Sequence, residues 1–450
     1  MKPVVIIGGG PAGIASASSL AEKGVKSVLI ERSKRLGGRA SSFFYSKMQE
    51  EIDYGQHVLM RCCTESIALL KLLSQEDFVR KDFVRKDTVR KNAVSFQPRL
   101  RIPMVDGRRR EIIASSPLPG ILHLLPSLLS YRFLPVRARM RAMQAGLSLL
   151  LRDPGDVAFA DWLADHSQGK RAITTLWDPV CVATLNAHAD DVSARMAQVV
   201  FQRGFFRPHG ADIGLLTRPL SQIFDAVTPF LEERQGTVLL DAAARRIIVD
   251  DGGVRGVEMA NGDLIEADAV ISAVSLPNLS PLLPSHVARD PFFESLAGIS
   301  FAPIVNIHLW FDRPVMDEPV IIGVDSPLQT VFDVSAAHGD INLHHLVISQ
   351  SAAAAWVDMP VASIVKQFVS ALSALLPRAR KANLIDSLVI KNREATFVPT
   401  PGADALRPAP TTPIEGLFLA GDYTATGWPS TIEGAVRSGI NAANALLTGD

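Results

Sequence analysis

The 450-residue chain has few cysteines, no net charge and no long apolar run, and each of these absences excludes a class of protein. Its three cysteines, Cys62, Cys63 and Cys181, form no CxxC pair, so neither a disulfide framework nor a zinc site is expected, and a reducing compartment fits best. Basic and acidic residues both number 46, which argues against a broad grip on nucleic acid. No run of 18 apolar residues occurs, so no membrane-spanning helix is predicted.

The N-terminus shows no basic leader followed by an apolar run, because residues 4–7 already have the pattern of a buried strand. A cytoplasmic protein is therefore expected, with a possible peripheral position on the inner face of the cytoplasmic membrane. The length exceeds the usual size of one domain, so two interleaved or consecutive domains are the starting expectation.

The first informative stretch is VVIIGGGPAGIASASSLAEKGVKSVLIER, which fills residues 4–32. Residues 3–31 predict a strand, a glycine turn, a helix that ends at Gly24, and a second strand. Gly8, Gly10 and Gly13 form GxGxxG between the strand and the helix, where backbone can approach a pyrophosphate. Glu31 closes the next strand and suits an adenosine ribose with a free 2′-hydroxyl. This stretch predicts a dinucleotide site but does not separate a nicotinamide from a flavin.

Two further glycine-centred stretches favour a flavin. Gly37, Gly38 and Arg39 follow directly and offer amides and a guanidinium to a second phosphate or a ribityl group. Residues 416–447 predict a buried strand, a turn at Gly421 and Asp422, and a helix that opens near residues 431–435. Asp422 can accept from ribityl hydroxyls, while the helix N-terminus can stabilise negative charge on a reduced isoalloxazine.

These three elements, in this order, resemble the two-dinucleotide-binding-domain flavoproteins, the superfamily of amine oxidases and phytoene desaturases. The resemblance implies FAD, held non-covalently because no cysteine lies near the C-terminus. It also implies that the strand near Ala244 meets the adenine through its backbone. The complete set of predicted cofactor-binding residues is Gly8, Gly10, Pro11, Ala12, Gly13, Glu31, Arg32, Gly37, Gly38, Arg39, Gly55, Gln56, His57, Ala244, Gly421, Asp422, Thr431, Ile432, Glu433 and Ala435.

The predicted fold is α/β: a Rossmann-type two-dinucleotide-binding FAD domain, an interleaved α+β substrate domain, and a helical, possibly membrane-docking segment. Other patterns predict a meander over 236–274, a helix over 220–231 kinked at Pro229, a strand over 302–311 and a helix over 361–376. The predicted boundaries are 1–75, 206–285 and 401–450 for the FAD-binding parts, 76–205 for the mainly helical substrate or docking segment, and 286–400 for the substrate-domain sheet and helices.

Four stretches resemble one narrower family, the squalene-associated FAD-dependent enzymes called hydroxysqualene dehydroxylases. They are IDYGQHVLM (52–60), LWDPVCVATLN (176–186), VNIHLWFDRPV (305–315) and AGDYTATGWPSTIEGAVRSG (420–439). Tyr54 stands where that family usually has Asn, and the near-identical pentads of residues 77–91 are an addition, interpreted as a duplicated, solvated surface segment. These departures bear on substrate fit and leave the FAD elements unaffected.

The narrower resemblance implies reductive removal of an allylic hydroxyl from hydroxysqualene, with an unidentified electron donor. A proton must reach the leaving oxygen, and His57 and Asp178 are the candidate catalytic residues. A His57 bonded to backbone and an Asp178 that caps a turn are equally open readings. Residues 117–141 combine apolar side chains with four arginines, which fits either a docking surface on anionic lipid or a buried helix pair with a charged edge.

Three rival functions remain open. A carotenoid-type desaturase needs the same apolar groove and runs the flavin in the oxidative direction. An amine oxidase needs an aromatic pair around the flavin; Tyr423 and Trp428 lie near the motif, but the chain has only four tyrosines. A non-catalytic, flavin-stabilised scaffold for squalene-pathway enzymes at the membrane is the third.

Overall fold

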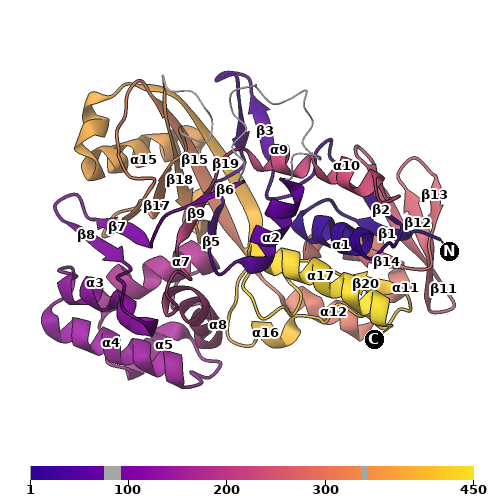
Figure 1. The fold of residues 1–450 in the computed structure, drawn as a ribbon, viewed down its shortest axis with the longest axis horizontal. Helices are drawn as coiled ribbons and strands as arrows, with labels where there is room; N and C mark the ends of the chain where they lie inside the picture. The colour runs from indigo at the N-terminus through magenta and orange to yellow at the C-terminus, as the bar shows by residue number, and fades with distance from the viewer. Residues whose placement is uncertain (1, 75–92, 336–342, 450) are drawn as a thin grey trace.

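The N- and C-terminal parts of the chain build one parallel sheet. The computed structural model describes residues 2–74, 93–335 and 343–449. Five parallel strands lie in the order β10-β2-β1-β14-β20, so segments from the start, middle and end of the chain meet side by side (Figure 1). Their bounds are β1 Val4–Ile7, β2 Ser27–Ile30, β10 Thr237–Leu239, β14 Val270–Ser272 and β20 Leu417–Leu419.

Both faces of this sheet are covered, which explains why β1 is a continuous apolar run. Val4 and Ile6 face the core formed with α1 (Pro11–Glu22) and α17 (Ile432–Thr448), whereas Val5 and Ile7 face the opposite core. The two helices cross closely because α17 has a glycine there: a Cβ at Gly439 would lie 2.1 Å from the carbonyl oxygen of Ala12. The predicted strand–turn–helix–strand unit is confirmed.

The predicted meander over 236–274 is correct only in part. Its first and last strands, β10 and β14, join the parallel sheet, but the three between them form a separate antiparallel sheet that covers one face of it. Those strands are β11 Ala244–Asp250, β12 Gly253–Met259 and β13 Leu264–Glu266. Two smaller sheets pair β3 (Ser42–Tyr45) with β4 (Glu50–Asp53), and β5 (Val58–Met60) and β6 (Val94–Phe96) with β9 (Ile213–Leu216).

The second unit is built on a seven-stranded sheet in the order β19-β15-β18-β17-β16-β7-β8. The strands are β7 Arg101–Val105, β8 Arg110–Ala114, β15 Phe301–Phe311, β16 Val320–Gly323, β17 Thr330–Asp333, β18 His344–Gln350 and β19 Leu384–Phe397. Helix α15 (Val361–Leu375) packs on one face of this sheet (Figure 1). The predicted strand at 302–311 and helix at 361–376 are both present.

A block of short helices lies at the far end of this sheet, away from the five-stranded parallel sheet (Figure 1). It comprises η1 Gly120–Leu124, α3 Leu125–Ser130, α4 Val136–Leu151, α5 Phe159–Asp165, α6 Lys170–Ala172, η2 Ile173–Trp177, α7 Asp178–Leu185, α8 Ala194–Val200 and η3 Phe201–Phe205. Residues 76–205, predicted to be mainly helical, also contain β7 and β8, which extend the seven-stranded sheet.

The kink predicted at Pro229 is displaced. The chain forms two helices, α9 (Leu220–Phe224) and α10 (Val227–Glu232), and Pro229 lies in the first turn of the second. Proline is tolerated there, and its ring conflicts with a helical carbonyl four residues earlier, at Asp225, where the helix breaks. The remaining helices are α2 Thr64–Leu73, α11 Ser285–Ala288, α12 Pro291–Ser295, α14 Ala354–Val357, α16 Ala403–Leu406, η4 Leu276–Asn278, η5 Ser280–Leu282, η6 Leu296–Gly298 and η7 Pro377–Lys381.

The pentads at 77–91 fall outside the described residues. Within residues 2–74, 93–335 and 343–449, none of the helices has both the length and the apolar character needed to cross a bilayer.

Candidate functional site

In the loop between β1 and α1, the close approach of backbone segments requires glycine at Gly8 and Gly13. A Cβ at Gly13 would lie 1.9 Å from the carbonyl oxygen of Gly8, so only glycine lets the helix start this close to the strand. Gly8 has φ +108° and leaves no room for a side chain beside Ala273. Gly10 differs: it has φ −75° at the N-cap of α1, and a Cβ there would meet no atom within 4 Å. Open space above Gly10 is what a pyrophosphate needs to reach the helix N-terminus.

The second predicted element lies directly against this loop. The amide of Gly37 donates to the carbonyl of Gly9 at 2.7 Å, and a Cβ at Gly38 would be 3.3 Å from the Cα of Gly10. Both glycines have positive φ values, +110° and +56°, which favours glycine at these positions. Two stretches separated by some 25 residues therefore form one backbone cradle.

Glu31 lies on the other side of the cradle. Its carboxylate is buried and accepts hydrogen bonds from the amides of Gly9, at 2.7 Å, and Ser33, at 2.8 Å. The chain before Ala244 runs alongside, because the amide of Ala242 donates to the carbonyl of Glu31. Ala244, at the start of β11, thus lies next to the position predicted for the adenosine, whereas the Arg32 side chain is exposed.

Arg39 ties the third element to the first two. Its guanidinium donates to Asp422 Oδ1 at 2.5 Å and to the carbonyl of Ala395 in β19 at 2.7 Å. Asp422 is buried and also accepts from the hydroxyl of Ser430. Residues 383 positions apart in the chain therefore meet at one polar centre, which also contacts β19 of the large sheet.

A buried arginine that the sequence did not reveal holds the loop after Asp422. The Arg407 side chain is fully buried, stacks on Phe397, and donates to the carbonyl of Thr424 at 2.5 Å and to the hydroxyl of Thr426 at 3.2 Å. It also pairs with Asp404 at 2.9 Å and donates to the carbonyl of Asp422 at 3.4 Å. The two carbonyls of the Asp422 loop carry no sequence signature. This clamp fixes the conformation in which Asp422 faces Arg39.

The C-terminal helix begins where it was predicted. Thr431 is the N-cap of α17, and its hydroxyl accepts from the amide of Gly434 at 3.1 Å. Ile432 and Ala435 lie in the first turn, so their backbone amides belong to the electropositive end of a 17-residue helix.

Glu433 has a different role from the predicted cofactor contact. Its side chain is fully buried and accepts from the amides of Glu65 and Ser66 at the N-terminus of α2, and from Arg437 Nε at 2.8 Å. A carboxylate at the N-terminus of α2 accepts hydrogen bonds from amides that have no partner within the helix, and its negative charge interacts favourably with the helix dipole. The side chain thus joins α2 to α17, and only its backbone is left to face a cofactor.

The connector from Gly55 to His57 joins β4 to β5. A Cβ at Gly55 would lie 2.3 Å from the side-chain amide nitrogen of Asn306 in β15, so any larger residue would displace the Asn306 side chain. Gln56 donates to the carbonyl of His57 at 3.1 Å. The Nε2 atom of His57 is buried and has no hydrogen-bond partner within the described part of the chain. Burial lowers the pKa of His57 to about 4, so the imidazole is neutral at neutral pH. A neutral imidazole offers one N–H and is a weak proton donor.

The depressed pKa of His57 predicts a pH dependence of stability. The unfolded chain binds a proton at this residue below about pH 6.5 and the folded chain does not, so the free energy of unfolding should fall as the pH drops from 6.5 to 4. His57 contributes at most about 3 kcal/mol to that fall. Buried Asp53, with its pKa raised to about 6, acts in the opposite sense, so variants must be compared over the same range.

We expect the free energy of unfolding of His57→Gln apoprotein, measured by urea unfolding at several pH values between 4 and 6.5, to change less with pH than that of wild type. His286→Gln, at an exposed histidine, serves as the control and should leave the slope unchanged. Parallel slopes for wild type and His57→Gln would contradict a buried neutral imidazole.

Asp178 does not point into a reactive space. It is the first residue of α7, and its carboxylate accepts from His188 Nδ1 at 2.7 Å and from the amide of Ala189 at 2.8 Å. Hydrogen bonding to Asp178 raises the pKa of His188. The turn-capping reading is therefore the one that the contacts favour, because both carboxylate oxygens hold the turn after α7.

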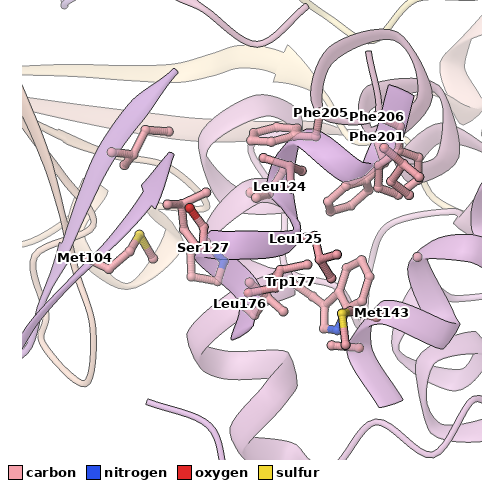
Figure 2. A pocket seen from close by; sticks show the side chains of 18 of the residues that line it. Met104, Leu124, Leu125, Ser127, Met143, Leu176, Trp177, Phe201, Phe205 and Phe206 are labelled. Carbon is pink, nitrogen blue, oxygen red and sulfur yellow. The ribbon is translucent and has the colours of Figure 1, made fainter. Parts of the chain in front are cut away.

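An apolar cavity of about 260 Å³ lies between the helical block and the β7–β8–β16 end of the large sheet, as Figure 2 shows. Apart from Ser127, its lining side chains are apolar or aromatic, and the Ser127 hydroxyl is bonded to the backbone of Ala114. Leu122 and Leu147 line the cavity and are also 49% exposed, so the cavity reaches the surface between η1 and α4. Its lining is Ile102, Met104, Ile113, Ile121, Leu122, Leu124, Leu125, Ser127, Leu128, Ala142, Met143, Gly146, Leu147, Leu176, Trp177, Pro179, Val180, Phe201, Phe205, Phe206 and Ile322.

Comparison with known proteins identifies the family. A family model described as "Flavin containing amine oxidoreductase" matches residues 11–447, nearly the whole chain. The chain belongs to the flavin-containing amine oxidoreductase family. Among curated relatives, a 15-cis-phytoene desaturase of Synechococcus elongatus is 25% identical, with 99% of this chain and 95% of the relative covered.

Solved structures share the fold of this flavin-containing amine oxidoreductase. An oxidoreductase from Methanosarcina mazei superposes with a TM-score of 0.77 at 18% identity, covering 99% of this chain and 100% of the other. A triple mutant of putrescine oxidase superposes with a TM-score of 0.74 at 17% identity, covering 100% and 99%.

The residues present fit the FAD of this family. Open space above Gly10, the glycine cradle at Gly37–Gly38, and the carboxylate of Glu31 are the features that a pyrophosphate and a ribose require. Asp422 and the N-terminus of α17 supply acceptors and donors for the ribityl chain and the flavin ring. The protein is thus an FAD-dependent oxidoreductase whose three glycine-centred elements converge as predicted, although Glu433 and Asp178 have structural partners instead.

Proposed function

We propose that this flavoenzyme acts on a long isoprenoid, and that its reaction is the reductive dehydroxylation of hydroxysqualene to squalene. The apolar cavity in the helical block carries the proposal: it suits a hydrocarbon chain and offers a charged or strongly polar substrate no partner in its lining. The four stretches that resemble hydroxysqualene dehydroxylases supply the choice of substrate and direction.

The chemistry of such a reaction sets requirements for the protein. Reduced FAD, when bound, supplies a hydride to the allylic carbon from which the hydroxyl departs. The protein has to exclude water from that carbon. Apolar cavity side chains such as Leu124, Trp177 and Phe205 would enclose the rest of the hydrocarbon chain. It also has to deliver a proton to the leaving oxygen.

We further propose that the enzyme meets its substrate at a membrane surface. A thirty-carbon hydrocarbon gains on the order of 20 kcal/mol on leaving water, so it resides in a bilayer. On α4, Val136, Met140, Leu147 and Leu151 are exposed at helical spacing, and Leu147 also lines the cavity mouth. Three exposed arginines within residues 117–141 suit anionic headgroups: Arg132, Arg137 and Arg141. Arg139 is instead bonded to backbone carbonyls.

Charging this surface should release the protein from lipid. Leu129 of the neighbouring helix α3 is 49% exposed, as is Met140 of α4. We expect the double variant Leu129→Asp, Met140→Asp to bind anionic liposomes about 100-fold more weakly, because each side chain contributes roughly 1.5 kcal/mol or more when buried in the interface. Leu264→Asp is the matched control, because Leu264 is 56% exposed but lies in β13 of the FAD unit. Equal co-sedimentation of wild type and the double variant would remove docking from the proposal.

One anaerobic experiment tests the reaction. The yellow protein is reduced with dithionite, freed of excess reductant and mixed with hydroxysqualene. We expect squalene to form in step with the return of oxidised flavin absorbance. Flavin that stays reduced in the presence of hydroxysqualene would refute the proposed reaction.

Carotenoid-type desaturation is the second candidate, and the curated relatives favour it. The phytoene desaturase of Synechococcus elongatus and a probable zeta-carotene desaturase of the same organism both align over 99% of this chain, at 25% and 24% identity. The same cavity suits a polyene. If phytoene reduces the oxidised enzyme, desaturation is the function.

Amine oxidation is less well supported. Tyr423 is fully buried against Ile299 and Phe397, and Trp428 lies between the guanidinium groups of Arg203 and Arg437, at 4.7 and 5.0 Å from its ring. Neither aromatic side chain is free to line an open cleft around an amine.

A further inference from the structure

A chain of buried polar side chains lies on the face of the large sheet that points away from α15. Strand alternation turns Val305, Ile307 and Leu309 of β15 toward α15, so Asn306, His308 and Trp310 occupy the opposite face. His345 of β18 is the direct cross-strand partner of Trp310 and shares that face. His308 and His345 are only 1% and 2% exposed. Histidine side chains are seldom buried this deeply unless their ring nitrogens have polar partners.

Each polar group on this face lies close to the next one, from His308 through His345 to Glu50. His308 Nδ1 is 3.1 Å from His345 Nε2, and His345 Nδ1 is 3.5 Å from Glu50 Oε1. Trp310 Nε1 donates to the same Glu50 oxygen at 2.5 Å, and its ring stacks on His345 with centroids 4.3 Å apart. Glu50 opens β4, so the hairpin β3–β4 lies over this part of the sheet.

The outer end of the chain reaches the surface. Tyr45 of the same hairpin stacks on Trp310 and donates to Asp386 at 2.6 Å. Asp386 also lies 3.5 Å from Lys47, whose side chain is 67% exposed. The Glu50 side chain is itself 13% exposed, so solvent reaches the chain of polar groups at this end.

The inner end lies next to the candidate active site. Asn306, two residues from His308 on the same face of β15, packs against Gly55 at the start of the Gly55–His57 connector. The neighbouring strand β19 pairs with β15 and provides the Ala395 carbonyl that holds Arg39 beside Asp422. The sheet face that carries His308 is thus in direct contact with the elements assigned to FAD.

We propose that Glu50, His345 and His308 form a proton relay to the substrate oxygen, a role that rests on the proposed dehydroxylation. His308 passes its Nε2 proton to the allylic hydroxyl, the carbon–oxygen bond breaks with both electrons on oxygen, and water leaves. His308 regains a proton at Nδ1 from His345 Nε2, His345 takes one at Nδ1 from Glu50, and Glu50 is reprotonated from solvent. Reduced FAD, when bound, would supply the hydride, so that the products are hydrocarbon, water and oxidised flavin.

The relay predicts an effect that depends on the leaving group. In single turnovers of pre-reduced enzyme, we expect His308→Gln, His345→Gln and Glu50→Gln to slow flavin reoxidation by hydroxysqualene at least about 100-fold. The acetate ester of hydroxysqualene needs no proton to lose its leaving group, so the same variants should process it within about threefold of the wild-type rate. His344→Gln is the matched control, since this buried histidine lies next to His345 in β18 but on its other face.

A second readout separates chemistry from structure. The affinity of the oxidised variants for hydroxysqualene, measured by calorimetry without turnover, should equal that of wild type, as should the melting temperature of His308→Gln. Equal slowing of the alcohol and the ester, or weakened binding, would show that the chain is only structural and overturn the relay. A wild-type enzyme that is reoxidised by neither compound would instead refute the dehydroxylation itself, and the relay with it.

Discussion

Replacing Gly10 by valine is expected to give a folded but colourless protein. A Cβ at this position meets no protein atom within 4 Å, and φ −75° suits any residue, so the apoprotein should lose only about 1 kcal/mol of stability from the poorer N-cap. The side chain would instead fill the space through which a pyrophosphate approaches the amides of α1. We expect the affinity for FAD to fall at least about 100-fold, which corresponds to about 2.7 kcal/mol.

Gly169→Val is the matched control for this experiment. Gly169 is likewise an N-cap, of α6, with φ −75° and no atom within 4 Å of a Cβ, but it lies in the helical block. Its variant should stay yellow. Flavin absorbance per folded protein and FAD titration of the apoprotein measure the difference. Wild-type affinity in Gly10→Val would mean that the pyrophosphate does not approach Gly10.

The local parts of the site could be predicted from the sequence because their signals are local. Gly8, Gly10 and Gly13 stand at the spacing that a strand–turn–helix requires, and Thr431 is a side-chain cap directly before its helix. The residues of the third element are remote from the first, but each element shows its own turn chemistry. Their order along the chain was enough to predict that they converge.

Roles that depend on packing between remote segments were not predictable. Asp178 caps a turn ten residues later, and nothing in its own neighbourhood separates that role from catalysis. The role of Arg407 could not be predicted because it holds the Asp422 loop largely through the carbonyls of Asp422 and Thr424, and every residue has a carbonyl. The break at Asp225 was misplaced because a proline's steric conflict is felt four residues before it.

The cavity and the histidine chain could not be predicted from the sequence either, because both are formed by segments that are remote in the chain. The cavity is lined from η1, α3, α4, η2, α7, η3 and three strands, and no single segment has a pattern that differs from ordinary core. His308 and His345 lie 37 residues apart and come together only through strand register. In the sequence His308 is a lone histidine in an apolar strand, and His345 is the second of two adjacent histidines at the start of another.

Glu433 offers the sharpest test of a corrected assignment. Glu433→Ala leaves the first amides of α2 and the guanidinium of Arg437 without their buried acceptor, so we expect a loss of about 3–5 kcal/mol in the free energy of unfolding. The loss should be of similar size in apoprotein and holoprotein, because the contacts involve no cofactor. Urea unfolding of both forms measures it.

Glu65→Ala serves as the control because Glu65 pairs with the same arginine, at 3.4 Å, but is 37% exposed. A partly solvated pair of this kind contributes at most about 1 kcal/mol. FAD affinity, measured on folded protein, should stay within about threefold of wild type in both variants, because the α17 amides that face the flavin are unchanged. A Glu433→Ala protein that unfolds like wild type but binds FAD poorly would reverse the assignment, since the carboxylate would then act on the cofactor and not on α2.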